Sequence, residues 1–185
     1  MSNIRLIISD IDGTILTSNH QVDEQLIEVM PELEKANIPF VLASARSPLG
    51  MQPIAHKLGL HDNPIACYNG ALVLEGNRTI IQHPVDKAEI QDLLNYLSKD
   101  NYLEVTAKHV SKEHALLEVA KYYDLPLEEV MTIGDNFNDS PMLALAGLGI
   151  AMGNAPEGVK ETANLVTASN DEHGVAQAIR EHALN

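Results

Sequence analysis

Two acidic stretches of this chain each follow a short apolar run and contain the residue types that bind a hard metal ion. Residues 10–14 read DIDGT, and residues 134–139 read GDNFND. Carboxylates gathered at one point repel each other unless a cation lies between them, and their oxygen atoms suit Mg²⁺. We therefore predict that Asp10 and Asp135 bind Mg²⁺.

An aspartate at such a site can attack a phosphate ester and form an acyl phosphate, which water then hydrolyses. We assign this nucleophilic role to Asp10. Asp12 is placed to protonate the leaving oxygen and later to deprotonate the water, provided that neighbouring negative charge raises its pKa. Ser44, through its hydroxyl and backbone N–H, and Lys112, through its ammonium group, would stabilise the transferring oxygens.

Each of these residues also has a purely structural interpretation. Asp-x-Asp-Gly is a common turn, residues 134–139 could form a helix-capping loop, and residues such as Ser44 and Lys112 are common in caps and on surfaces. Their positions favour the chemical interpretation. All four segments follow predicted strands or begin helices beside them, and open parallel sheets bind ligands at the carboxyl ends of their strands.

The elements that position these residues are β-rich runs alternating with helical patterns, which predict a doubly wound, Rossmann-like α/β fold. In this fold a parallel sheet has helices on both faces. The predicted strands cover residues 4–9, 39–44, 64–68, 130–133 and 148–152. The predicted helices cover residues 23–36, 48–59, 111–123, 141–147 and 174–184. Pro31 predicts a kink or a late start in the first helix.

Two further patterns lie between the third predicted strand and Lys112. Residues 71–82 predict a hairpin, because two β-rich runs flank Glu75, Gly76 and Asn77. Residues 86–98 predict an amphipathic helix.

Length and composition exclude several classes of protein. The 185 residues fit one compact domain, or one domain with a small appendage. The net charge of −14 would repel nucleic acid and anionic membranes, so we expect neither as a partner. Cys67 is the one cysteine and lies in an apolar run, which predicts a buried structural thiol. A cytoplasmic protein is expected, because no signal peptide or membrane-spanning run is found.

The histidines and glycines match none of the common cofactor motifs. The eight histidines show no His-x-x-x-His pair and no cysteine partner at zinc spacing, so we expect ordinary surface or core residues. The absence of a P-loop and of Gly-x-Gly-x-x-Gly argues against nucleoside triphosphate or dinucleotide binding of those kinds.

With these segments in this order, the chain resembles a haloacid dehalogenase-like (HAD) phosphatase of the Cof type over nearly its whole length. Residues 10–14 match the first motif of the family, Ser44 the second, Lys112 the third and residues 134–139 the fourth. Residues 69–71 (NGA) and 151–155 (AMGNA) are also similar to stretches typical of this subgroup. One departure is Ala45, which replaces a glycine usual between the second-motif hydroxyl residue and the arginine.

The resemblance implies hydrolysis of sugar phosphates or similar small phosphomonoesters through an aspartyl-phosphate. It implies that Mg²⁺ is held by Asp10, Asp135 and the backbone carbonyl of Asp12. Asp139 would reach the metal directly or through water. Three further residues would line the phosphate site, namely Arg46, Asn69 and Asn138.

The larger departure from the family lies between Gln82 and Tyr102. Here the family inserts an αβ cap, a small domain of roughly 100 residues, which closes over the substrate and supplies specificity. We divide the chain into a first core part (1–82), a residual or minimal cap segment (83–102) and a second core part (103–185). Two explanations fit this short segment: a naturally minimal enzyme, or one from which most of the cap has been removed. We favour the second, because the hairpin and the helix predicted at 86–98 resemble the base of a cap.

An open site of this kind predicts weak, unselective activity, and it predicts a homo-oligomer in which a second subunit covers the site, as in capless relatives. Two alternatives to a phosphatase remain open. One is a phosphomutase of the same superfamily. The other is a non-catalytic phospho-acceptor that resembles bacterial receiver domains, although receivers place the acceptor aspartate on a later strand.

Overall fold

One mixed sheet of eight strands organises the chain in the computed structural model, which describes residues 3–85 and 110–185. The strand order is β5-β4-β3-β2-β1-β6-β7-β8. The six strands β3, β2, β1, β6, β7 and β8 run parallel to one another. In contrast, β4 is antiparallel to β3, and β5 is antiparallel to β4. The strands are β1 (Leu6–Ser9), β2 (Phe40–Ala43), β3 (Pro64–Cys67), β4 (Leu72–Glu75), β5 (Arg78–Gln82), β6 (Val130–Gly134), β7 (Leu148–Ala151) and β8 (Leu165–Val166).

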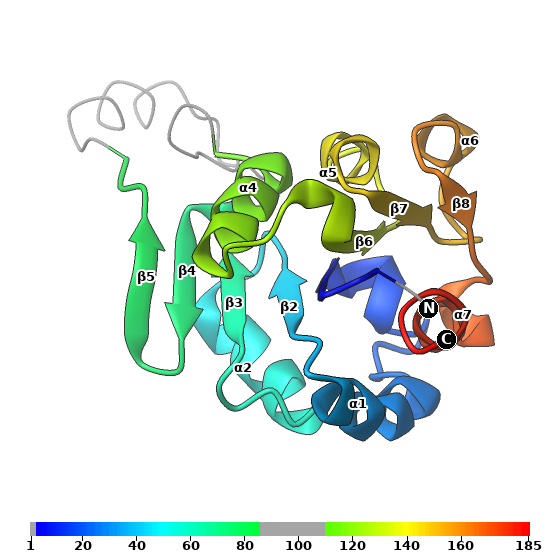
Figure 1. Ribbon diagram of the computed structural model, residues 1–185, viewed down its shortest axis with the longest axis horizontal. Helices are drawn as coiled ribbons and strands as arrows, with labels where there is room; N and C mark the ends of the chain where they lie inside the picture. Colours follow the sequence, from blue (N-terminus) through cyan, green and yellow to red (C-terminus); the bar gives the residue numbers. More distant parts are fainter. Residues whose placement is uncertain (1–2, 86–109) are drawn as a thin grey trace, which may run out of the picture.

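Helices cover both faces of this sheet (Figure 1). On one face lie α1 (Glu24–Ala36), α2 (Pro48–Lys57) and α7 (Gly174–His182). On the other lie α4 (Lys112–Tyr122) and α5 (Ser140–Leu145). The short α6 (Glu157–Lys160) packs against β7.

The central strands are buried on both faces, which explains their continuous apolar sequences. In β1, Ile7 contributes to the core under α1 and α7, while Leu6 and Ile8 contribute to the core under α4 and α5. Successive side chains of a strand point to opposite faces, so each apolar run supplies both cores.

Local sequence signals set the helix boundaries. Asp23 caps α1 by accepting a hydrogen bond from the backbone N–H of Gln25 at 3.1 Å, and Ser111 caps α4 by accepting from that of His114 at 3.2 Å. Of the two outcomes predicted from Pro31, a kink or a late start, the late start is wrong, because α1 begins at Glu24 and contains this proline. Tertiary packing of the buried face of α1 outweighs the backbone hydrogen bond that proline removes.

The predicted strands and α-helices of the described residues are present, and one further strand and one further α-helix are found besides short 3₁₀ and π turns. The five predicted strands correspond to β1, β2, β3, β6 and β7, and the hairpin is β4–β5. Neither β8 nor α6 was predicted from the sequence. Both β8 residues are exposed and the strand has only two residues, so it presents no apolar run. The helix predicted at 86–98 lies outside the described residues, as does all of the 83–102 segment except residues 83–85. No described helix combines the length and apolar character that crossing a membrane requires.

The strand order creates a switch point between β1 and β6. From β1 the chain moves through β2 to β3, and it later returns to the opposite side of β1 as β6. Ser9 is aligned with Leu42 of β2 and with Ile133 of β6. The residues that follow these three strands therefore meet at one edge of the sheet, where open α/β sheets bind ligands.

Candidate active site

Asp10 leaves the end of β1 into a buried position. Its backbone N–H donates to the carbonyl of Ile133 at 3.0 Å, which fixes it against β6. The side chain is only 7% exposed. Burial raises the pKa of Asp10 from 3.8 to about 7, although the Lys112 ammonium opposes this shift.

Lys112 lies between two buried carboxylates. Its Nζ is 2.6 Å from Oδ1 of Asp10 and 2.5 Å from Oδ1 of Asp139, and its side chain is 1% exposed. Burial opposes the charge on Lys112, but the two carboxylates outweigh burial and raise its pKa. The cap of α4 by Ser111 sets the start of the helix that holds this lysine.

Asp135 follows β6 and faces the turn after β1. Thr14 donates a hydrogen bond from its hydroxyl to Oδ1 of Asp135 at 2.8 Å, a contact that the sequence analysis missed. Gly13 has a φ of +77°, and a Cβ at this position would collide with the Asp135 carboxylate. Glycine is therefore required here for both its backbone conformation and its small size. Burial raises the pKa of Asp135.

Asp139 is fully buried, and both of its carboxylate oxygens are used. Oδ1 binds Lys112, while Oδ2 accepts from the backbone N–H groups of Asp135 at 3.0 Å and of Asn136 at 2.9 Å. A carboxylate held in this way shapes the loop after β6 and orients the lysine.

Asp12 forms a bidentate ion pair with Arg46 at the mouth of the site. Arg46 donates from Nε at 2.7 Å and from Nη2 at 2.5 Å, and the Asp12 side chain is half exposed. The sequence predicted negative charge beside Asp12, whereas the structure places a guanidinium against it. Arg46 was also expected among the phosphate-binding residues, and in this structure the guanidinium binds a protein carboxylate.

The Ser44 backbone N–H, predicted to bind the transferring oxygens, is instead used by the sheet. It donates to the carbonyl of Ala66 at 3.0 Å, so only the buried hydroxyl remains from the predicted pair of donors. The backbone N–H of Asn69 donates to the Ser44 carbonyl at 2.8 Å. Asn69 has a φ of +54°, and this left-handed turn joins the loop after β3 to the loop after β2.

Asn138 is exposed in the turn between β6 and α5. Its side chain therefore lies outside the buried group formed by Asp10, Lys112 and Asp139.

Asn154 is a second residue whose contact the sequence analysis missed. Its Nδ2 donates to the carbonyl of Gly13 at 2.9 Å, and its Oδ1 accepts from the backbone N–H of Asn170 at 3.0 Å. Asn170 in turn donates to the carbonyl of Leu16 at 2.8 Å. The AMGNA stretch, noted from the sequence without a role, thus braces the turn that follows Asp10.

Three carboxylates could hold a metal ion, and we call them the carboxylate cluster: Asp10, Asp135 and Asp139. One oxygen from each lies within 4.8 Å of the others, and no other such group of three is found among residues 3–85 and 110–185. With Lys112 charged and all three carboxylates ionised, two negative charges remain unbalanced. The oxygen donor set and this residual charge fit a hard divalent cation.

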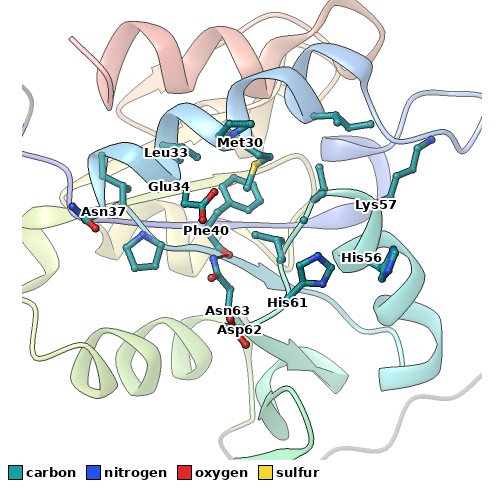
Figure 2. A pocket seen from close by; sticks show the side chains of 17 residues that line it. Met30, Leu33, Glu34, Asn37, Phe40, His56, Lys57, His61, Asp62 and Asn63 are labelled. Carbon is teal, nitrogen blue, oxygen red and sulfur yellow. Dashed lines mark hydrogen bonds between the residues drawn. The ribbon is translucent and has the colours of Figure 1, made fainter.

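A cavity of about 660 Å³ lies elsewhere, between α1 and α2 near the start of β2 (Figure 2). Phe40 and Asn63 line it at the amino ends of β2 and β3. The carboxylate cluster lies beyond the opposite ends of these strands. We therefore place the active site at the cluster, where the buried ionisable groups are, and not at this cavity.

Comparison with known sequences identifies one family. The chain matches the family of haloacid dehalogenase-like hydrolases over residues 7–102 and 97–179. A protein of Haemophilus influenzae is 30% identical over 256 residues, which span 96% of this chain and 97% of that protein. A 5-amino-6-(5-phospho-D-ribitylamino)uracil phosphatase of Bacillus subtilis is 27% identical and covers 98% of this chain and 97% of its own length.

Solved structures show the same fold at lower identity. A haloacid dehalogenase-like hydrolase from Bacteroides thetaiotaomicron superposes with a TM-score of 0.86 at 22% identity, covering 96% of this chain and 99% of that chain. A sugar phosphatase of HAD subclass IIB superposes with a TM-score of 0.83 at 20% identity and covers 98% of this chain and 100% of that chain.

Proposed function

Since the chain belongs to the haloacid dehalogenase-like hydrolases of the Cof type and is a phosphatase of that superfamily, we propose that it hydrolyses small phosphomonoesters through an aspartyl-phosphate on Asp10. One observation carries this proposal: the Asp10 carboxylate at the end of β1 lies 2.6 Å from the Lys112 ammonium, within a cluster of three carboxylates. The family match also favours a hydrolase over a receiver-like phospho-acceptor.

The reaction has two steps. In the first, an Asp10 oxygen bonds to phosphorus, the ester P–O bond breaks, and Asp12 gives a proton to the leaving oxygen. In the second, Asp12 takes a proton from water as the water oxygen attacks phosphorus, which releases inorganic phosphate and restores Asp10. The half-exposed position of Asp12 at the mouth of the site supports this role, because the leaving group must depart to solvent.

Mg²⁺ is the metal we propose, with Asp10, Asp135 and the backbone carbonyl of Asp12 as its ligands. When bound, it would neutralise the carboxylates and a phosphate oxygen and polarise the phosphorus. Asp139, whose oxygens accept hydrogen bonds from Lys112 and from the backbone N–H groups of Asp135 and Asn136, would reach the metal directly or through water. Thr14 orients Asp135 through its hydroxyl.

Five residues are proposed to bind the phosphate group of the substrate: Ser44, Arg46, Asn69, Lys112 and Asn138. Ser44 would use its hydroxyl, and Lys112 would stabilise the charge that develops on the transferring oxygens. Arg46 would have to exchange its Asp12 partner for phosphate, which would also release Asp12 for proton transfer. The bidentate guanidinium geometry suits either oxyanion.

The substrate class we propose is small phosphorylated metabolites such as sugar phosphates. The two relatives described above with named activities act on different compounds, a ribitylaminouracil phosphate and sugar phosphates. They share a phosphate monoester and differ in the organic group, so the core residues shared with them are expected to recognise the phosphate.

Residues 83–102 are proposed to be the remnant of a larger cap between two core parts, 1–82 and 103–185. The two family matches meet at residues 97–102, within this segment. The alignment with the H. influenzae relative spans 256 residues although this chain has 185, so that relative contains residues absent here. Mass spectrometry of the natural gene product tests this proposal: a mass equal to that of this short chain would refute removal of the cap.

We also propose that a second copy of the chain covers the open site. Leu49, which follows β2, is 82% exposed, and Phe137, which follows β6, is 62% exposed. Leu49 lies in the first turn of α2 and Phe137 in the turn before α5, both at the sheet edge that carries the site, where burial by another subunit would stabilise them. A monomer at micromolar concentration in sedimentation would contradict this proposal.

The proposed function is tested by Asp10→Asn, which keeps the shape of the side chain and removes the nucleophile. Phosphate release from a panel of phosphorylated metabolites should require Mg²⁺ and should vanish in this variant, while Asp62→Asn on the surface should retain it. Full Mg²⁺-dependent turnover by Asp10→Asn would overturn the mechanism. Fast release of inorganic phosphate is expected; a long-lived phosphoprotein would instead indicate a phospho-acceptor.

A further inference from the structure

Two histidines outside the carboxylate cluster face each other at the base of α4. His83 follows β5, and His114 lies in the first turn of α4; both are half-buried. Their Nε2 atoms are 3.1 Å apart, and the ring planes are inclined at 67°. We call these two residues the histidine pair. Sequence spacing gave no sign of it, because the two residues are 31 positions apart.

The ring centres of the histidine pair lie closer together than a straight hydrogen bond between them would place them. With the nitrogens 3.1 Å apart, a straight N–H···N hydrogen bond would place the ring centres about 5.5 Å apart, since each nitrogen lies about 1.2 Å from its ring centre. The centres are in fact 4.9 Å apart. Ring axes that meet would converge about 2 Å beyond each Nε2, which is the usual Zn–N distance.

From this geometry we propose that the histidine pair is a binding site for a borderline divalent transition metal ion such as Zn²⁺. Imidazole nitrogens suit Zn²⁺, Cu²⁺ and Ni²⁺, whereas Mg²⁺ prefers oxygen. The site is thus chemically distinct from the carboxylate cluster. The described residues supply no third His, Cys, Asp or Glu ligand close enough to complete it, so water would fill the remaining positions.

An ion bound by the histidine pair would connect two elements of the fold. The backbone N–H of His83 donates to the carbonyl of Ala71 at 2.7 Å, directly after the turn that contains Asn69. His114 lies two residues after Lys112, and Ala115 of the same helix packs against Gly70. An ion shared by the pair would therefore tie the end of β5 to the helix that carries Lys112. This inference goes beyond the proposed phosphatase function and does not depend on it.

The test is a Zn²⁺ titration of chelator-treated protein against a chromophoric zinc indicator, with Mg²⁺ in millimolar excess to occupy the carboxylate cluster. His83→Gln and His114→Gln should each weaken Zn²⁺ binding on the order of tenfold or more, since loss of even an outer partner of a metal ligand costs 10–100-fold. His61→Gln is the matched control, because His61 pairs with His56 at a ring distance of 5.2 Å away from this site. It should bind like the wild type.

The double variant separates a shared ion from two independent weak sites. If one ion needs both imidazoles, His83→Gln/His114→Gln should lose no more affinity than the weaker-binding single variant. Zn²⁺ affinity of His114→Gln equal to that of the wild type would overturn the proposal. Losses of Zn²⁺ affinity that add in the double variant would also overturn it. If the wild type binds no Zn²⁺ under these conditions, the two histidines form a hydrogen-bonded pair only, and the proposal is overturned. Far-UV circular dichroism of each variant checks that it is folded.

Discussion

At the scale of single residues, Lys112 balances the charge of the buried site. Among residues 3–85 and 110–185 it is the one cation in contact with both Asp10 and Asp139, and all three side chains are at most 7% exposed. We expect Lys112→Gln to lower the free energy of unfolding of the metal-free protein by about 3–5 kcal/mol, because it leaves buried charges unpaired. Urea unfolding in a chelating buffer measures this, with exposed Lys121→Gln as the control. A loss of stability as small as that of Lys121→Gln would contradict the charge-balancing role of Lys112.

A second prediction at the scale of single residues concerns Gly13. Alanine there requires a φ of +77° and also collides with the Asp135 carboxylate. Gly59→Ala is a matched control, because Gly59 has a φ of +73° but open space around it. We expect the control to lose about 1–2 kcal/mol of stability and to keep Mg²⁺-dependent turnover. Gly13→Ala should lose more stability than Gly59→Ala and should also lose its turnover. If the two variants behave alike in unfolding and phosphate-release assays, the collision with Asp135 has no effect on stability or activity.

At the scale of elements, the turn after β1 depends on a loop that follows β7. Asn154 connects the Gly13 carbonyl to the backbone of Asn170, and Asn170 reaches the Leu16 carbonyl. These bonds hold both ends of the turn that presents Asp12 and Thr14.

We therefore expect Asn154→Ala to lower stability by about 1 kcal/mol for the lost hydrogen bonds. Its kcat should fall more than its KM rises, because the turn that presents Asp12 is displaced while the phosphate-binding groups remain. Steady-state kinetics and thermal unfolding measure the two effects. Asn77→Ala in the exposed hairpin turn should change neither. Unchanged kcat in Asn154→Ala would show that the turn keeps its position without this brace.

At the scale of the whole molecule, the buried site should make stability depend on pH. Burial raises the pKa of Asp10 to about 7 in the folded, metal-free protein, against 3.8 ordinarily. The unfolded chain therefore releases this proton at lower pH than the folded chain does. The contribution of Asp10 to the free energy of unfolding is thus fully present below about pH 4 and is lost as the pH rises toward 7.

Urea unfolding of the wild type and Asp10→Asn in chelating buffer isolates this contribution from the other acids of the chain, which has a net charge of −14. The wild type should become less stable relative to Asp10→Asn as the pH rises from about 4.5 to about 7.5. Mg²⁺ added at the higher pH should restore stability to the wild type by binding its folded state. A difference that stays constant with pH would argue against the raised pKa.

Much of the architecture could be predicted from local sequence. Apolar runs located β1, β2, β3, β6 and β7, because strands buried on both faces must be apolar throughout. The strand β8 could not be found in this way. Leu165 and Val166 are both exposed, and they form a strand because Ile150 of β7 pairs with Leu165.

The sequence by itself determined which chemical groups come together. Chain order dictates that Asp10, Ser44 and Asp135 follow strands, and parallel strands bring their carboxyl ends to one edge. Only the tertiary structure decided how those groups are paired. Arg46 binds Asp12 across 34 residues, and Asn154 binds the Gly13 carbonyl across 141. Such contacts depend on side-chain directions between loops, which no local pattern of residues specifies.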